Sequence, residues 1–532
     1  MPPEIVAGLV EQPQIDGGPT AHPELEADEI KRLALRGVGA LILRSIGQRG
    51  MQMIGNVLLA RWLAPTTFGL YAIVSFVIGI AGFLADLGLG ASLIQRREKL
   101  SEKDLRTAFT LSLVLNGLIV VVLWALAGPI VSAYGVSGSH ATAVRVMSLS
   151  VLFSSFTVIP TITLERSLRF KQISVADLAG QMVYLGVTVP LAFGYRAPSH
   201  AETNADAAVW IFVWGSLASR AVHTAIMNLS SRWRPRIGLD LRAMRTMLAF
   251  GLPYQATGFV NALKDNFIPT FVAAVAGATA VGYITWAVGM VTNALILLPV
   301  VSRVTFPAYA RLQHDPEALR GAIESSIKWV AATVFPATLL IVALARQFVE
   351  HVYGPKWAPG LPSVYLLSIP MLHAAYSTVM VSALYGLGRA RTVLRLTVIW
   401  AIAGWGIGVP LTLWLGEHGF ALGMSIVSWM SIMTVREMNK VIRVRFVRTL
   451  AKIFILAGIP AAIIAVTARF VVTDGLSLAA VALAGGAVYL ALLWVSGELA
   501  DVKALLARRR AAGGRPAETA ARPAETAVIE HA

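Results

Sequence analysis

Apolar segments long enough to cross a membrane recur about fourteen times along this chain of 532 residues. A helix needs about 20 mostly apolar residues to span the hydrocarbon core of a bilayer. Only 14% of the residues are charged, whereas a soluble domain carries roughly 25%. The sequence therefore predicts an all-α integral membrane protein with about fourteen transmembrane helices. The expected spans are 38–60, 68–94, 108–132, 146–165, 176–194, 208–228, 247–275, 281–302, 325–348, 361–385, 393–415, 419–436, 450–472 and 476–496.

The basic residues fall almost entirely on one side of these spans. If residue 1 is cytoplasmic, 37 of the 45 Lys and Arg residues lie in cytoplasmic tails and loops, and 6 lie on the other side. Arg220 and Lys264 remain deep within spans. This asymmetry is typical of the positive-inside rule. It predicts an even number of spans with both termini in the cytoplasm, and it explains the net charge of +16 without a nucleic-acid partner.

The chain has no cysteine, which excludes disulfides, thiol catalysis and thiolate metal sites. The longest expected loop on the outer side, about 195–208, is short. A membrane enzyme acting on sugars outside the cell would usually need a larger loop there. We therefore expect no catalytic residue, no metal and no cofactor.

Two stretches of the chain match each other at a constant offset of 213 residues. QRGMQMIGNVLLARWLAPTTFGLYA at 48–72 aligns with NALKDNFIPTFVAAVAGATAVGYIT at 261–285. The alignment pairs Gln48 with Asn261, Gln52 with Asp265, and Gly69 with Gly282. Two shorter matches follow in the same order, AYG at 133–135 with VYG at 352–354 and LRFK at 168–171 with GRAR at 388–391. A duplication of six spans would explain them, with both copies in the same orientation and a site at their interface.

The duplication predicts five parts. They are a disordered cytoplasmic tail (1–35), a first lobe with spans 1–6 (36–238), a second lobe with spans 7–12 (239–446), spans 13 and 14 (447–497), and a second disordered cytoplasmic tail (498–532).

Polar residues inside the spans are the candidate site residues, because such residues usually face a cavity or a partner. Gln48, Gln52 and Asn56 repeat at every fourth position of the first span, and Arg49 lies beside them. We expect these four side chains to bind substrate. The alternative is a helix-packing face, since the same span contains several glycines that let helices approach.

The seventh span carries a similar group. Asn261 and Asp265 are four residues apart and share a face, and Lys264 lies roughly 100° around the helix. We expect Asn261 and Lys264 to bind substrate and Asp265 to couple transport to an ion. A structural ion pair between helices is the alternative.

Two further charges lie deep within expected spans. Arg220 is roughly 18 Å from the basic cluster near Arg232 and could bind a phosphate or pair with Asp86 or Asp177. Asp86 is either an ion-coupling acid or a structural acid at a glycine-rich bend. In the tenth span, His373, Tyr376 and Ser377 form a polar face that is either sugar-facing or packed.

One family resemblance emerges from the motifs. NVLLARWLAPTTFGLYAIVSFVIGIAGFLADLGLGASLIQR at 56–96 resembles the first hairpin of Wzx-type polysaccharide flippases, which belong to the superfamily of multidrug, oligosaccharidyl-lipid and polysaccharide exporters. The matching elements are Leu-Ala-Arg at 59–61, Pro65, Phe68-Gly69, Tyr71 and Asp-Leu-Gly-Leu-Gly at 86–90. The stretch 261–285 is similar to the family's seventh span, although Pro269 and residues 272–274 depart from its pattern. The similarity covers roughly 36–450.

The resemblance implies two six-helix lobes in a V-shaped bundle, with two extra helices at the C-terminal end. It implies a flippase that moves polyprenyl-diphosphate-linked oligosaccharide repeat units across the bacterial inner membrane, by alternating access around a cationic cavity. The expected partners are this lipid-linked oligosaccharide, membrane lipids, and a polysaccharide polymerase with its chain-length regulator, and the expected state is a monomer. Two alternatives stay open. They are an ion-coupled multidrug or metabolite exporter of the same superfamily, and a polysaccharide polymerase or ligase.

Overall fold

The computed structural model describes residues 47–85, 88–95, 100–167, 169–195, 205–231, 233–296 and 298–498. This part of the chain is almost entirely helical and contains no strand, so the predicted all-α fold is confirmed. Both predicted tails lie outside the described residues, apart from Glu498. The helices are 47–62, α3 (Pro65–Ala85), α4 (Leu89–Gln95), α5 (Glu102–Ala133), α6 (His140–Arg166), α7 (Phe170–Gly194), α8 (Ala205–Ser230), α9 (Leu241–Thr292), α10 (Leu298–Arg311), α11 (Pro316–Gln347), α12 (Leu361–Gly386), α13 (Ala390–Ser428), α14 (Ser431–Asn439), α15 (Val447–Val471) and α16 (Gly475–Val495), with short helical turns η1–η4 between some of them.

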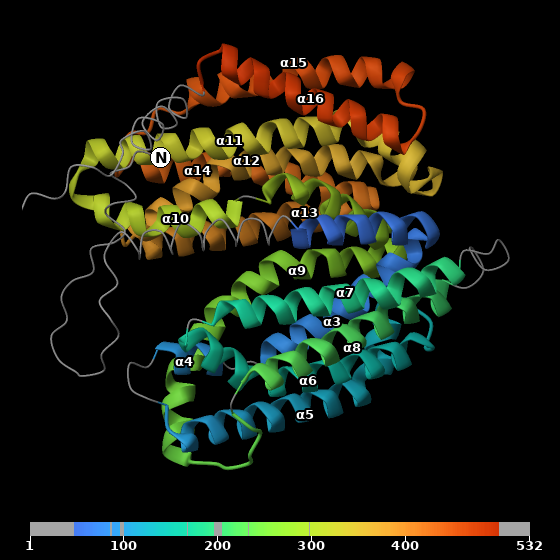
Figure 1. Cartoon of the computed structure of the whole chain (residues 1–532), viewed down its shortest axis with the longest axis vertical. Coiled ribbons are helices and arrows are strands. Elements are labelled where there is room, and N and C mark those ends of the chain that lie inside the picture. Colours follow the sequence, from blue (N-terminus) through green and yellow to red (C-terminus); the bar gives the residue numbers. More distant parts are fainter. Residues whose placement is uncertain are drawn as a thin grey trace, which may run out of the picture.

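Two of the long helices each consist of two helices that meet at a glycine. The backbone has φ 81° at Gly277 within α9 and φ 59° at Gly416 within α13, a conformation that favours glycine. The chain reverses at Gly416, because an added Cβ on Gly419 would lie 1.8 Å from the carbonyl oxygen of Leu411. In Figure 1 both the start of α9 and α10 lie at the left, so the second part of α9 leads back across the molecule. The described chain therefore makes fourteen helical passes, as predicted.

The expected span 68–94 is not one helix, and this prediction was wrong. α3 ends at Ala85 and α4 begins at Leu89, with Gly88 between them at φ 66°. An added Cβ on Gly88 would lie 2.5 Å from the carbonyl oxygen of Gly251. The close approach of two backbones at this glycine breaks the helix.

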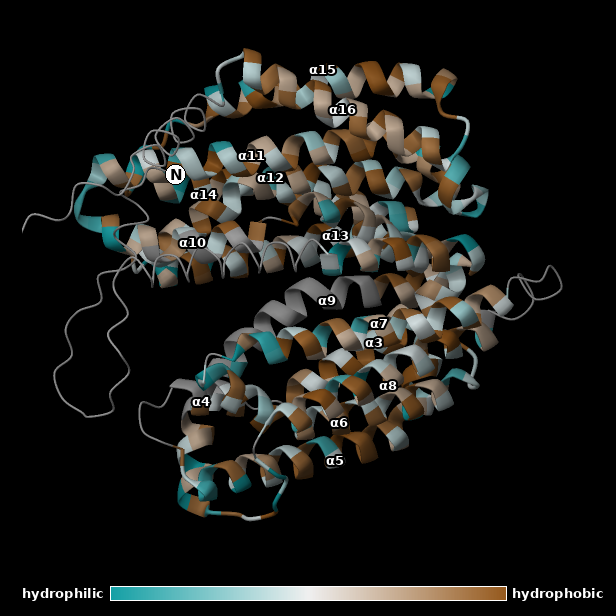
Figure 2. Cartoon of the chain, viewed as in Figure 1, coloured by the Kyte–Doolittle hydropathy of each residue, from teal (hydrophilic) through white to brown (hydrophobic). Residues whose placement is uncertain are grey.

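The helices have the composition of membrane spans. Ten stretches in the described part of the chain are long and apolar enough to cross a membrane. Figure 2 shows hydrophobic residues along the middle of the helices and hydrophilic residues at the loops that join them. This pattern, together with the length of the helices, identifies a multi-pass membrane protein.

The helices form two groups in Figure 1. α3–α8 lie in the lower part of the view, α10–α16 lie in the upper part, and 47–62 and α9 lie between them. The largest buried apolar cluster joins residues of α10–α16, including Tyr309, Ile323 and Met380. A separate cluster joins α3, α5, α6 and α8, including Val74, Val120 and Val209. The exact lobe boundaries at 238 and 446 stay a prediction.

The two stretches that match at an offset of 213 residues cross each other in the structure. α3 and the second part of α9 touch backbone to backbone at Gly69 and Gly282, the pair that the sequence alignment matched. An added Cβ on Gly69 would lie 1.7 Å from the carbonyl oxygen of Ala278, and one on Gly282 would lie 2.0 Å from that of Pro65. These contacts are reciprocal, because Ala278 itself lies 213 residues after Pro65. The crossing therefore lies on a local two-fold axis between the repeats.

The two shorter matches also recur as backbone conformations. Gly135 and Gly354 both have positive φ, 63° and 98°. Arg169 and Arg389 precede α7 and α13 with nearly equal angles, φ −86° and ψ 52° against φ −86° and ψ 37°. The matched sequences thus form matched turns, which supports an internal duplication.

Candidate functional site

The two repeats are joined at one end by a hydrogen-bonded contact, which we call the seal. Thr66 and Thr279 hydroxyl oxygens lie 2.7 Å apart at the helix crossing. The end of helix 47–62 adds three bonds to the segment that precedes α12. Arg61 Nη1 donates to the carbonyl of Val352 (3.2 Å), Lys356 Nζ donates to the carbonyl of Arg61 (3.0 Å), and Trp357 Nε1 donates to the carbonyl of Ala60 (2.9 Å).

Aromatic packing reinforces the seal. Trp357 is fully buried, and its ring meets Phe68 edge-on at 5.3 Å and Trp286 at 5.1 Å between centroids. Fixed donors, an aromatic core and the glycine crossing thus hold the two repeats together at this end.

A cavity of about 680 Å³ begins directly beside the seal, and we call it the central cavity. Helix 47–62, α3 and the second part of α9 form its walls, and α7 and α8 contribute one aromatic ring each. Its polar side chains are Arg49, Gln52, Asn56, Ser75, Thr285, Thr292 and Asn293, and its aromatic side chains are Phe68, Tyr71, Phe76, Phe83, Tyr184, Phe212, Trp286 and Tyr353.

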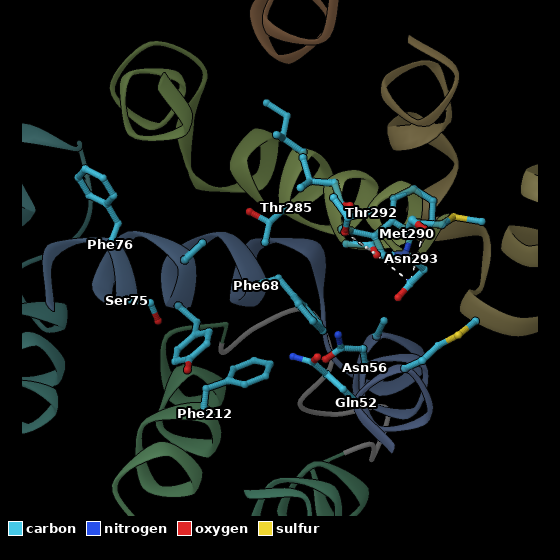
Figure 3. A pocket seen from close by; sticks show the side chains of 18 of the residues that line it. Gln52, Asn56, Phe68, Ser75, Phe76, Phe212, Thr285, Met290, Thr292 and Asn293 are labelled. Carbon is cyan, nitrogen blue, oxygen red and sulfur yellow. Dashed lines mark hydrogen bonds between the residues drawn. The ribbon is translucent and has the colours of Figure 1, made fainter. Parts of the chain in front are cut away.

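Amide groups meet across the central cavity. Figure 3 shows Gln52 and Asn56 side by side on helix 47–62, with Asn293 of the opposite wall directed toward the same space. Asn293 Nδ2 donates to the carbonyl of Gly289 (2.9 Å), and Thr292 Oγ1 donates to that of Val288 (2.8 Å). These bonds to their own helix fix the orientation of both side chains, and leave their oxygens as acceptors on the cavity side.

A second cavity of about 870 Å³ lies within the first group of helices, and we call it the hydroxyl-lined cavity. Gln52, Asn56, Tyr71, Ser75 and Tyr184 line both cavities, so the two adjoin. Its remaining polar wall is formed by Ser112, Asn116, Ser150, Ser154, Thr157, Thr161, Gln181, Ser216, Ser219 and Arg220. Fourteen of its described side chains thus carry a hydroxyl or an amide, and two of them are aromatic.

The charge of both cavities is positive among the residues that the structure describes. Arg49 is the charged residue on the wall of the central cavity, and Arg220 is the one on the wall of the hydroxyl-lined cavity. No described lining residue of either cavity is a carboxylate. A guanidinium binds anions such as phosphate through short, charge-assisted hydrogen bonds.

The structure describes five of the nine predicted site residues with their side chains. Arg49, Gln52, Asn56 and Arg220 line the cavities, whereas Gln48 lines neither. Gln48 shares a helix with three of these residues and lies one turn before Gln52, about 40° around the helix axis from it. Asn261, Lys264 and Asp265 belong to the helical backbone of α9, but their side chains lie outside the described part, and Asp86 lies outside it altogether.

Several cavity residues were not predicted. Ser150, Ser154, Thr157 and Thr161 follow one face of α6 at spacings of four, three and four residues, and they form one wall of the hydroxyl-lined cavity. This spacing is the signal that could have identified them, because it marks a single helical face. Asn116 of the neighbouring helix α5 is buried and donates a hydrogen bond to Ser155 of α6 (2.8 Å).

Two other polar groups have local partners. His223 Nε2 of α8 lies 3.3 Å from Asp177 Oδ1 of α7. His373 Nδ1 lies 2.8 Å from Ser428 Oγ, and the Tyr376 hydroxyl lies 2.6 Å from Ser431 Oγ, with the same offset of 55 residues. The polar face of the tenth span therefore packs α12 in parallel against the helices that follow Gly416.

Comparisons with known proteins agree with this architecture. A family model described as "Polysaccharide biosynthesis protein" matches residues 58–362. The "Lipopolysaccharide biosynthesis protein WzxC" of Escherichia coli is 27% identical over 328 residues, 60% of this chain and 63% of that protein. The "Teichuronic acid biosynthesis protein TuaB" of Bacillus subtilis is 24% identical over 300 residues, 54% of this chain and 58% of that protein. The alignments thus span less than two thirds of these two relatives.

A solved structure has the same fold. The lipid II flippase MurJ in its inward closed conformation superposes with a TM-score of 0.70 at 14% identity, over 86% of this chain and 99% of that one. The likeness establishes the fold.

Proposed function

The chain belongs to the polysaccharide biosynthesis protein family, and on this basis we propose that it is a flippase for polyprenyl-diphosphate-linked oligosaccharide repeat units. It would move them from the cytoplasmic to the outer leaflet of the bacterial inner membrane, for the synthesis of a surface polysaccharide such as lipopolysaccharide or exopolysaccharide. The names of its relatives, which include a lipopolysaccharide and a teichuronic acid biosynthesis protein, support this substrate class.

The observation that carries the proposal is the pair of polar, cationic cavities inside the membrane. Sugars and phosphates do not cross hydrocarbon unaided, because each desolvated polar group costs several kcal/mol. A flippase must therefore supply hydrogen-bonding groups and positive charge along the path. The hydroxyls and amides of the cavity walls offer the first, and Arg49 and Arg220 offer the second.

The mechanism that we propose is alternating access of the two repeats. The basic loops lie at the end of the helices opposite the seal, so the positive-inside rule assigns the seal to the outer face. The central cavity begins at the seal, and the hydroxyl-lined cavity adjoins it on the side away from the seal. In this state the lipid-linked substrate enters from inside, and opening of the seal releases it outside while the cytoplasmic ends close.

We propose that Lys264 and Asn261 bind the diphosphate and that Asp265 couples transport to an ion. Lys264→Ala is expected to stop export while the protein still inserts and folds, and Lys264→Arg, which keeps the charge, is the matched control. Normal surface polysaccharide in the Lys264→Ala strain would refute the phosphate-binding role. Asp265→Asn should abolish dependence on the ion gradient, and an unchanged dependence would remove Asp265 as the coupling residue. The same exchange at Asp86 tests the second predicted coupling acid.

Deletion of the protein is the decisive experiment. Lipid-linked repeat units should accumulate in the cytoplasmic leaflet, where periplasmic glycosidases and impermeant labels do not reach them. Accumulation of unpolymerised units in the outer leaflet would instead identify a polymerase or ligase. If no lipid-linked unit accumulates and cells become sensitive to cationic drugs, the protein is a multidrug or metabolite exporter. No described residue that lines either cavity is acidic, which argues against cationic cargo, although the aromatic wall of the central cavity suits such cargo.

The remaining proposals concern the surroundings of the protein. We place it in the inner membrane as a monomer, without an enzymatic activity of its own, and with both termini in the cytoplasm. Single cysteines introduced into each tail should react with thiol reagents only after the membrane is permeabilised. The polymerase and its chain-length regulator would receive the substrate on the outer face, and co-purification from the native membrane tests their association.

A further inference from the structure

The two cavities differ in chemistry in a way that divides the proposed substrate between them. The central cavity has eight aromatic side chains, and the hydroxyl-lined cavity has two. The hydroxyl-lined cavity instead carries fourteen hydroxyl or amide side chains. Aromatic rings suit an isoprenoid chain and its linkage, whereas hydroxyls and amides match the donors and acceptors of a sugar.

The hydroxyl-lined cavity also holds acceptors that have no partner in the described structure. Asn116 is only 3% exposed, and its Nδ2 donates to the carbonyl and hydroxyl of Ser112 and to Ser155 Oγ (2.8 Å). Its Oδ1 is buried and receives no hydrogen bond, and the same holds for Ser75 Oγ. Both atoms are enclosed by protein, so a ligand in the cavity meets the other hydroxyls and amides of its wall.

The α6 wall presents threonine hydroxyl oxygens to the cavity as hydrogen-bond acceptors. Thr157 Oγ1 donates to the carbonyl of Ser154 (2.9 Å), and Thr161 Oγ1 donates to that of Thr157 (2.8 Å). Each hydroxyl hydrogen is thereby used within the helix, and each oxygen keeps lone pairs for a donor from the cavity. Sugar hydroxyl groups are such donors, while a diphosphate at neutral pH offers acceptors only.

We propose that the hydroxyl-lined cavity is the binding site for the oligosaccharide, and that the central cavity holds the diphosphate and the first isoprene units. The glycan and the diphosphate belong to one molecule, so their sites must adjoin. The two cavities do adjoin, because Gln52, Asn56 and Tyr71 line both of them. The volume of the hydroxyl-lined cavity, about 870 Å³, falls in the range of small-molecule sites, so this cavity accommodates a short glycan of a few sugars. Arg220, its charged described residue, then receives an anionic substituent of the glycan.

This inference rests on the proposed function and is tested by binding. The purified protein is titrated with two probes, which are undecaprenyl diphosphate without sugar and the lipid-linked oligosaccharide extracted from the deletion strain. The test variant is the double exchange Thr157→Val and Thr161→Val, which keeps the side-chain shape and removes both oxygens. The matched control is Thr163→Val on the same helix. Thr163 Oγ1 also bonds within its helix, to Ile159 and Pro160, but it lines neither cavity.

The double variant should bind the lipid-linked oligosaccharide roughly tenfold more weakly, the loss expected for two hydrogen bonds, and should bind undecaprenyl diphosphate as the wild type does. Thr163→Val should change neither affinity. Asn116→Leu adds a second test on the neighbouring helix α5, and its thermal melting shows whether the protein remains folded.

The outcomes separate the inference from the proposed function. If the wild type binds both probes equally well, or if the double variant weakens both equally, the glycan is not held in this cavity and the inference fails. In either case the flippase proposal still stands. If the wild type binds neither probe, the flippase proposal itself fails.

Discussion

The exchange Gly69→Ala is expected to open the seal, because no side chain fits at the helix crossing. An added Cβ would lie 1.7 Å from the carbonyl oxygen of Ala278, which is backbone and cannot rotate away. A tolerable contact of about 3.2 Å requires α3 and α9 to separate by about 1.5 Å. The hydroxyl pair of Thr66 and Thr279, now at 2.7 Å, would then exceed hydrogen-bonding distance.

The cost of such overpacking is about 1–3 kcal/mol. It applies to the sealed state alone if the repeats separate when the protein opens. The ratio of open to sealed molecules should therefore rise roughly 5- to 150-fold.

Thiol labelling measures this ratio directly, since the chain has no cysteine of its own. Thr285→Cys, which places an exposed reporter in the central cavity, is combined with Gly69→Ala and exposed to a membrane-impermeant maleimide from the outside. The labelling rate should rise by the factor given above. Gly82→Ala is the matched control on α3, because an added Cβ there meets nothing within 4 Å. Equal labelling rates in both variants, with equal melting temperatures, would refute the role of the crossing as the seal.

Three further perturbations probe the same architecture. Thr66→Cys combined with Thr279→Cys should form a disulfide under oxidant and stop export until a reductant is added, whereas either single exchange should leave export unchanged; export by the cross-linked protein would disprove an opening at this point. Trp357→Phe keeps an aromatic ring but removes the indole N–H, so the Ala60 carbonyl loses its donor; this should weaken the seal by about 1–3 kcal/mol and accelerate Thr285→Cys labelling. Glu498 accepts hydrogen bonds from Lys452 and Lys328, and these lower the pKa of its carboxyl below the ordinary 4.5. The Glu498 carboxylate therefore stabilises the fold at pH values above the ordinary pKa, and this stabilisation is lost as the pH falls through the lowered pKa. Glu498→Gln should reduce the melting temperature at pH 7 and have a vanishing effect in acid. A difference in melting temperature that persists undiminished in acid would contradict this origin.

Much of the fold could be predicted from the sequence because a membrane permits few alternatives. Each span must be helical and about 20 residues long, so apolar runs give both the number and the rough boundaries of the passes. The repeat signal was also informative at Gly69 and Gly282, since it matched two residues that lie against each other in space. A glycine-rich bend at Asp86 was one of two predictions, but the end of the helix at Gly88 was not predicted, because it depends on the approach of Gly251 from a helix far along the chain.

The site was predictable only in part. Arg49, Gln52, Asn56 and Arg220 were identified because charges and amides are rare in spans. Gln48 has the same chemistry, and only the rotation of helix 47–62 within the bundle decides that its side chain misses the cavities. Serine and threonine gave no comparable signal, since they are common in membrane helices and usually bond to their own backbone. The hydroxyl-lined wall of α6 is recognisable only in the structure, where six other helices enclose it.

The glycine crossing also bears on the entropy of each transport cycle. Gly69 and Gly282 have no rotamers to restrict when the two halves meet, and Thr66 and Thr279 have few. Arg61 and Lys356, at the edge of the same contact, each lose up to about 2 kcal/mol of side-chain freedom on forming their bonds. Reclosure should thus begin at the crossing, where ordering costs least, and the long basic side chains should settle last. The seal would then form from the backbone contact at its centre outward to the side chains at its edge.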